Sequence, residues 1–129
     1  MTVTVETGMR GTASLVVSDV DTSIALGSGD IDVLGTPRLI ALCEAATVSA
    51  LADQLDDSVA SVGMRIRVDH LQPTPVGAAV TAEAVLDKID GRRLTFTVSV
   101  SDTGGLVAAG KITRALVDRA SFLDKCCTA

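Results

Sequence analysis

The chain of 129 residues fits a single domain, residues 1–129, and is long enough to bury a hydrophobic core without disulfides or metals. Its net charge of −5 and its two phenylalanines, with no tyrosine or tryptophan, argue against a nucleic-acid-binding surface. Although 47% of the residues are hydrophobic, no apolar run approaches the roughly 20 residues that cross a bilayer, and the first ten residues lack a signal-peptide segment, so we expect a cytoplasmic protein that does not contact membranes.

The first predicted elements are a strand and a loop that lead into one long helix. Residues 12–19 alternate weakly between apolar and polar side chains and form a candidate strand. Residues 21–36 are rich in Gly, Ser and Asp, which is typical of a loop. Thr36 followed by Pro37 indicates the start of the helix. A Thr side chain at the N-cap can accept from a free backbone N–H, and the N–H that proline lacks would have no partner at the next position. We expect the helix to end within residues 54–58.

This helix is apolar almost all the way round, yet Glu44 lies in its middle. The residues three and four positions away are Ile40, Ala41, Thr47 and Val48, so no stripe of charges surrounds the glutamate. A buried glutamate is rare unless it is paired. A helix that is apolar on every side also needs cover on every side, and one sheet covers only one face. We therefore expect a homodimer, most simply with two-fold symmetry, in which a second subunit covers the rest.

Four long β-rich segments follow the helix, and short turn sequences separate them. Asp90-Gly91 is a strong hairpin signal, and Gly104-Gly105 is a second one. We therefore predict a single α+β domain in which an antiparallel sheet is wrapped around one long central helix. The predicted strands are residues 61–71, 79–89, 92–102 and 106–118.

Two of these strands carry a polar residue on an apolar face. The two-residue period places His70, the only histidine, and Arg114 among apolar neighbours. Each of Glu44, His70 and Arg114 has a plain structural explanation: an ion partner for the glutamate, a bond to a carbonyl for the histidine, or a strand end for the arginine head. Together they suggest a site. The expected faces hold Val62, Met64, Ile66 and Val68 with His70, and Leu106, Ala108, Gly110, Ile112 and Leu116 with Arg114.

The start of the helix can contribute to this site, because its free N–H groups suit an oxyanion or a polarised carbonyl. Thr36 and Glu44 are eight residues apart, roughly 12 Å along the helix axis, so they cannot touch within one helix. A substrate lying along the helix could meet both residues. Alternatively, a two-fold axis could bring Glu44 of one chain near the helix start of another.

We expect neither a metal nor a cofactor. The sequence contains three cysteines, an odd number without metal-ligand spacing. Cys43 falls within the apolar helix, whereas Cys126 and Cys127 are adjacent in a polar tail. We interpret all three as reduced and structural.

Several segments, in order and at compatible spacings, resemble the hotdog-fold acyl-CoA thioesterases, and within them the fluoroacetyl-CoA thioesterase branch. They are the Gly-Thr pair at residues 35–36, the glutamate eight residues later, VDHLQPTPVGAAVTAEA, DGRRLTFTVSVSD and GKITRALVDRASF. The resemblance implies a hotdog domain, a dimer with sites near the subunit interface, and no metal. It also implies that Thr36, Glu44 and His70 form the catalytic set and that Arg114 lines the site.

We therefore expect hydrolysis of an acyl-CoA-type thioester to a carboxylic acid and a free thiol. In this hypothesis Glu44 acts as base or nucleophile, His70 shuttles a proton, and Thr36 orients the carbonyl. Basic residues beside the Asp90-Gly91 turn could meet CoA phosphates, although a solvated hairpin tip is the simpler explanation. The expected substrate-binding residues are Gly35, Arg92, Arg93 and Arg114.

Two other functions fit the same residues. A hotdog-type 3-hydroxyacyl thioester dehydratase or hydratase would also use a histidine and a carboxylate. A non-catalytic acyl-thioester binding module would keep the pocket but would not turn over. Hydration of an enoyl thioester, or binding without thiol release, would distinguish these two from a hydrolase.

The segment before the helix bears on acyl selectivity. Residues 26–34, LGSGDIDVL, contain no aromatic side chain, whereas phenylalanines in this stretch form a lid in the fluoroacetyl-CoA thioesterase branch. A lid of Gly, Ser and Asp offers little apolar area and much backbone freedom. We therefore expect no strong preference for fluoroacetyl-CoA over acetyl-CoA.

Overall fold

The computed structural model describes residues 4–127, in which five strands form one antiparallel sheet with the order β1-β3-β4-β5-β2. The strands β1 and β2 are therefore the two edges of the sheet. The strands are β1 Arg10–Val16, β2 Val59–His70, β3 Ala79–Asp90, β4 Arg93–Asp102 and β5 Gly105–Asp118. The helices are the short 3₁₀ helix η1 Asp19–Asp21, α1 Ser23–Leu26, α2 Thr36–Ala50 and α3 Arg119–Cys127.

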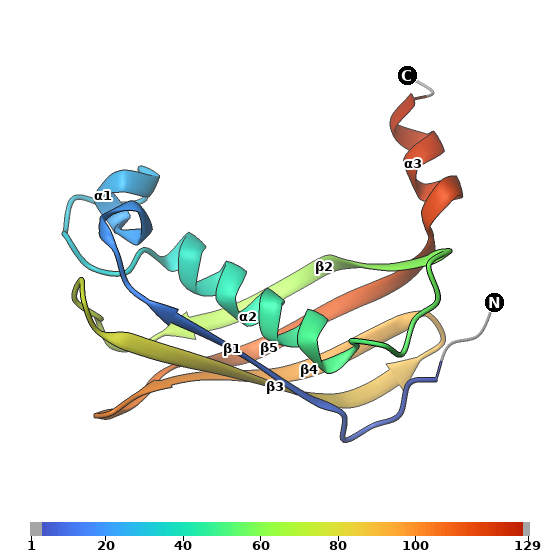
Figure 1. Cartoon of the computed structure of the whole chain (residues 1–129), viewed down its shortest axis with the longest axis horizontal. Coiled ribbons are helices and arrows are strands. Elements are labelled where there is room, and N and C mark those ends of the chain that lie inside the picture. The colour runs from blue at the N-terminus through green and yellow to red at the C-terminus, as the bar shows by residue number, and fades with distance from the viewer. Residues whose placement is uncertain (1–3, 128–129) are drawn as a thin grey trace.

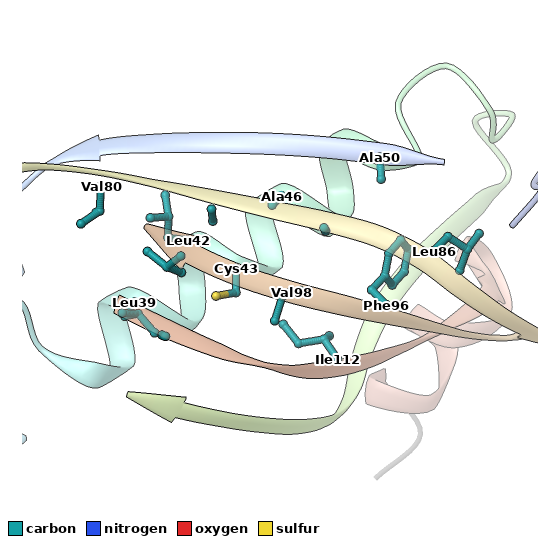
Figure 2. Close-up of a cluster of buried hydrophobic side chains, with 14 of the residues drawn as sticks. Leu39, Leu42, Cys43, Ala46, Ala50, Val80, Leu86, Phe96, Val98 and Ile112 are labelled. Carbon is teal, nitrogen blue, oxygen red and sulfur yellow. The ribbon is translucent and has the colours of Figure 1, made fainter. Parts of the chain in front are cut away.

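The central helix α2 lies along one face of the curled sheet, with α1 next to its first turn (Figure 1). Figure 2 shows the apolar side chains that fill the space between helix and sheet. This arrangement confirms the predicted α+β fold with a sheet around one central helix. The buried residues in this view are Leu39, Leu42, Cys43, Ala46 and Ala50 from α2, and Val80, Leu86, Phe96, Val98 and Ile112 from the strands.

The opposite side of α2 has no cover from residues 4–127. Pro37, Ala41, Ala45 and Val48 are exposed, and Val48 keeps 51% of its surface. A helix with two apolar sides usually lies between two layers. The single sheet therefore covers only one side of α2, as the sequence predicts, while the second subunit stays a prediction.

A β-bulge inverts the alternation of side chains in the middle of β2. Gly63 pairs with Arg114 and Arg65 pairs with Thr113, so Met64 has no partner in the β5 ladder. The extra residue exchanges the two faces of the strand at that point. The prediction that Val62 and Met64 share an inward face with His70 is therefore wrong, whereas Ile66, Val68 and His70 do share a face.

A second bulge changes the start of β5. Val100 pairs with Ala108 and Ser101 pairs with Leu106, so Val107 is the additional residue. Val107 is buried, whereas Leu106 keeps 50% of its surface exposed. The predicted inward position of Leu106 is therefore wrong, for the same reason as in β2.

Several predicted boundaries differ from the observed ones. The predicted loop over residues 21–36 contains α1, and α2 ends at Ala50, before the expected residues 54–58. The predicted polar tail contains α3, which projects away from the sheet (Figure 1). All three cysteines are free, with Cys43 buried and the two in α3 exposed. Within residues 4–127, no helix is both long and apolar enough to cross a membrane.

Candidate active site

The start of α2 is held by Gly35, which is the N-cap with an extended backbone conformation, φ −74° and ψ 141°. The prediction of Thr36 as N-cap is therefore wrong, because Thr36 is already the first helical residue. A Cβ atom on Gly35 would lie 2.8 Å from Cδ1 of Leu26 and 3.2 Å from Cα of Ser23. Only glycine lets α1 pack this closely against the beginning of α2.

Most backbone donors at the start of α2 already have partners. The Gly35 N–H donates to the Asp21 carbonyl at 2.8 Å, so it is not open to a substrate. The Gly35 carbonyl accepts from the N–H groups of Arg38 and Leu39, and proline at position 37 has no N–H. Within residues 4–127, the Thr36 N–H is the donor at this helix start that has no protein partner.

Asp21 connects the segment before the helix to α2. Its buried carboxylate accepts from the Ser18 N–H at 2.8 Å, from the Ser18 hydroxyl at 3.0 Å and from Arg38 Nε at 3.2 Å. These donors, with the Ser18 N–H first, lower the pKa of Asp21 despite its burial. Sequence reasoning missed this residue, although the Ser-x-x-Asp spacing from Ser18 to Asp21 is a capping signature that indicates such a contact.

The exposed hydroxyl of Thr36 contacts the predicted histidine. Thr36 Oγ1 lies 2.8 Å from Nδ1 of His70, at the end of β2. The two residues line a hollow of about 260 Å³ together with Ser23 and with Val33 and Leu34, the last two residues of the predicted lid segment. The side chains that line this hollow from the lid are therefore aliphatic.

His70 is poised to exchange a proton. Burial lowers its pKa by disfavouring the imidazolium, and a backbone contact with Gln72 opposes part of this shift. Its other ring nitrogen, Nε2, is buried and has no hydrogen-bond partner among the described residues. Whether Nδ1 accepts from the Thr36 hydroxyl or donates to it depends on the tautomer of His70.

Glu44 pairs with Arg114, as the sequence pattern suggests for a glutamate on an apolar helix. Arg114 Nη1 lies 3.3 Å from Glu44 Oε2, and the arginine keeps 8% of its side chain exposed against 35% for the glutamate. The arginine head does not escape at a strand end. Its Nε donates to the Ser61 hydroxyl at 3.0 Å and its Nη2 donates to the Ser61 carbonyl at 2.9 Å.

The electrostatics of this pair follow from its burial. Desolvation lowers the pKa of Arg114, and the neighbouring Glu44 carboxylate opposes that shift. An arginine guanidinium stays charged at neutral pH under such a change. The pair is therefore a fixed cation, held in place by Ser61, beside a carboxylate that remains partly open to solvent.

Gly63 completes the surroundings of Glu44, and sequence reasoning missed it. A Cβ atom at this position would lie 2.6 Å from Glu44 Oε2 and 3.8 Å from Arg114 Nη1. The bulge at Met64 is what turns Gly63 toward the helix, opposite Arg114. A strand glycine can indicate a bulge or a close approach, and that was the available signal.

Within one chain the candidate residues form two separate groups. Thr36 meets His70, and Glu44 meets Arg114, but no contact joins the two groups among the described residues. The eight residues between Thr36 and Glu44 correspond to roughly 12 Å along α2. The structure thus brings the predicted residues together in pairs and not as one cluster.

The two predicted phosphate-binding arginines lie elsewhere. Arg92 lines a hollow of about 300 Å³ beside Phe122 and Lys125 of α3. Arg93 lines a different hollow, together with Lys88 on the face of the sheet that points away from α2. Among the described contacts, neither arginine meets Thr36, Glu44 or His70, and their role in substrate binding stays a prediction.

Comparisons with known proteins identify the family. The model of the family described as fluoroacetyl-CoA-specific thioesterase matches residues 17–120, which include every catalytic candidate. The fluoroacetyl-CoA thioesterase of Streptantibioticus cattleyicolor is 35% identical over 94 residues, which are 73% of this chain and 68% of that protein. This identity confirms the resemblance to the acyl-CoA thioester hydrolases.

Solved structures agree with this result. A variant of fluoroacetyl-CoA thioesterase in complex with acetyl-CoA is 31% identical, with a TM-score of 0.88, and the match covers 94% of this chain and 96% of that one. A hot-dog-like protein from Thermanaerovibrio acidaminovorans is 26% identical, with a TM-score of 0.82, over 92% of this chain and 87% of that one. The hotdog prediction is confirmed, and the chain belongs to the fluoroacetyl-CoA-specific thioesterase family of hydrolases.

Proposed function

We propose that this chain hydrolyses an acyl-CoA thioester to a carboxylic acid and free CoA, with Thr36, His70 and Glu44 as its catalytic groups. The observation that carries the proposal is the 2.8 Å contact between Thr36 Oγ1 and His70 Nδ1 at the start of α2. The solved relative that holds acetyl-CoA supports this substrate class.

Thr36 is suited to the thioester carbonyl. Its free N–H lies at the positive end of the helix dipole and its hydroxyl projects from the same residue. Both can donate to the oxygen that gains charge as the carbonyl carbon is attacked. Removing one such donor typically lowers kcat by about 10² to 10³.

His70 and Glu44 then supply the proton transfer and the attack. His70 Nδ1 and the Thr36 hydroxyl carry the proton that water releases to the sulfur that leaves as the C–S bond breaks. Arg114 contacts Glu44 through Oε2 only, so Oε1 is left for a water molecule or the substrate in the described part of the chain. Glu44 acts there as the base toward water or as the nucleophile toward the carbonyl carbon.

We further propose that the protein works in the cytoplasm as a two-fold homodimer. The three free thiols fit a reducing compartment. The uncovered apolar side of α2, with Ala41, Ala45 and Val48, is the surface for the second subunit. This symmetry would place Glu44 of the partner subunit near Thr36 and His70, and so join the two groups that one chain keeps apart.

The test is thiol release from a panel of acyl-CoA substrates, followed by complementation between inactive variants. Thr36→Ala and Glu44→Gln subunits are refolded together in equal amounts. Half of the resulting dimers are mixed, and each mixed dimer holds one intact composite site, so about a quarter of the wild-type activity should return.

The matched control is a mixture of Thr36→Ala with His70→Ala. Both changes affect the same side of the composite site, so this mixture should stay inactive. Absence of recovery in the first mixture, with light scattering showing dimers, would contradict the composite site. Absence of thiol release by the wild-type protein from every acyl-CoA would contradict the proposed hydrolysis.

A further inference from the structure

The face of the sheet that points away from α2 carries a concentration of positive charge. Two hollows of about 410 and 140 Å³ lie there and share the lining residues Arg65, Lys88, Thr95 and Thr113. Five basic and two acidic residues line them, a net charge of 5 − 2 = +3 on a chain whose net charge is −5. We call these five basic residues the outer basic face: Arg65, Arg67, Lys88, Arg93 and Lys111.

The arrangement of these charges opposes stability. Arg67 lies directly opposite Lys111 in the β2–β5 ladder. Like charges in such a cross-strand pair destabilise a sheet. Lys111 is partly compensated by Asp87, at 3.4 Å, and by Thr97. The other four basic residues have no carboxylate partner within residues 4–127.

The outer basic face also offers the geometry that phosphate groups prefer. Guanidinium groups present several N–H donors in a planar fork that matches phosphate oxygens. The hydroxyls of Thr95 and Thr113, 3.3 Å apart, lie between the basic side chains and add further donors. A dianionic or trianionic ligand would relieve the repulsion that the free protein carries.

This surface is close to the candidate active site across a single strand. Gly63 faces Glu44 on the inner side of β2, whereas Met64 and Arg65, the next two residues, line one of the outer hollows. Since β2 is an edge strand, the inner and outer sides meet at its edge. The surroundings of Glu44 and the outer basic face therefore lie on the two sides of the same stretch of β2, at the bulge.

We propose that the outer basic face is a binding site for phosphate groups. Two sources share this chemistry: the diphosphate and 3′-phosphate of the CoA substrate, or a free polyphosphate that binds independently of catalysis. The first source rests on the proposed hydrolysis of acyl-CoA, whereas the second does not.

The experiment compares a double variant with a control of equal charge. Arg67→Gln with Lys111→Gln removes the opposed pair, and Arg10→Gln with Arg119→Gln removes two positive charges outside this surface. Binding of inorganic diphosphate and of CoA is measured by calorimetry at one low salt concentration. Turnover is measured with acetyl-CoA and with acetyl-pantetheine, which lacks the diphosphate and the nucleotide.

We expect the double variant to lose at least about tenfold in diphosphate affinity, and the control to lose much less. Its melting temperature should be unchanged or higher, because a like-charge pair is removed. If CoA is the source, CoA binding weakens too, KM for acetyl-CoA rises, and turnover of acetyl-pantetheine is unchanged. If a free polyphosphate is the source, diphosphate binding falls while KM for acetyl-CoA does not change.

The proposal is overturned if the wild-type protein binds neither diphosphate nor CoA. Equal losses in the double variant and in the control would also overturn it, because they would indicate a general effect of net charge. The direct binding measurements need no turnover. Failure of the proposed hydrolysis would instead appear as absence of thiol release from all thioesters, whatever the diphosphate affinity.

Discussion

Substitution of Gly63 by alanine tests how closely the position of Glu44 is controlled. The added Cβ atom would lie 2.6 Å from Glu44 Oε2, whereas ordinary contacts at this position need 3.4 Å or more. The carboxylate must therefore move by roughly 1 Å, and a displacement of this size can lower a rate by about 10²-fold. This corresponds to about 2.7 kcal/mol in the activation barrier.

The same substitution should have little effect on the folded state. Gly63 does not have a positive φ, so alanine can adopt its backbone conformation, and Glu44 is a flexible side chain that keeps 35% of its surface exposed. We expect kcat for thiol release to fall about 100-fold, while thermal unfolding shifts by only a few degrees. The substitution should thus lower activity strongly without a comparable loss of stability.

Gly104→Ala is the matched control, because its Cβ atom would lie 3.3 Å from Oδ1 of Asp102 in the β4–β5 turn and it also lacks a positive φ. This variant should keep the wild-type kcat. If Gly63→Ala hydrolysed acyl-CoA as fast as Gly104→Ala, the assignment of a catalytic role to the Glu44 carboxylate at this position would be refuted.

Four further predictions concern the titration of His70, the other catalytic candidates and the choice of acyl group. Because burial lowers the pKa of His70, the midpoint of the acid limb in a pH profile of kcat/KM should lie below the usual histidine value of 6.5. A midpoint above 6.5 would contradict the assignment of His70 as the proton-transfer group. As pH falls, His70 is protonated in the unfolded chain before it is protonated in the folded one. The free energy of unfolding, measured by denaturant titration, should therefore decrease as pH falls below 6.5. Thr36→Ala and Glu44→Gln should each lower kcat by about 10² to 10⁴ in a thiol-release assay, with dimers retained in light scattering. Because residues 26–34 contain no aromatic side chain, kcat/KM for fluoroacetyl-CoA should exceed that for acetyl-CoA by less than about 10³-fold when both are assayed side by side.

Most of the fold can be predicted from the sequence because hydrophobic periods and turn residues agree with each other. The β3–β4 hairpin follows from Asp90-Gly91, where the structure has a glycine with φ 60°. The two bulges cannot be predicted from a period of two, because they change the phase without changing the composition. A strict period of two therefore places Met64 and Leu106 on the wrong face. The nine-residue helix α3 is too short for its periodicity to be distinguished from a tail.

The candidate site is only partly visible in the sequence. Glu44 and Arg114 can be identified from the sequence because a charge on an apolar face needs a partner. In the structure each is the partner of the other. The role of Ser61 depends on a tertiary contact with Arg114 that no local pattern reports, and the one local signal for Gly63 is a glycine within a strand. The hydroxyl of Thr36 likewise contacts His70, 34 residues away, whereas a local rule assigns it to the helix cap.

The closed base of the segment before α2 allows the residues beyond it to vary without moving the candidate active site. Thr22 and Leu34 form an isolated β-bridge, and the Ser23 N–H donates to the Val33 carbonyl at 2.9 Å. The two ends of the intervening loop are therefore held side by side. Lengthening a loop with fixed ends costs only about 0.6 kcal/mol for each doubling. Residues 27–32 can therefore change in length and sequence while Ser23, Val33 and Leu34 keep lining the hollow beside Thr36 and Leu26 keeps its place against Gly35.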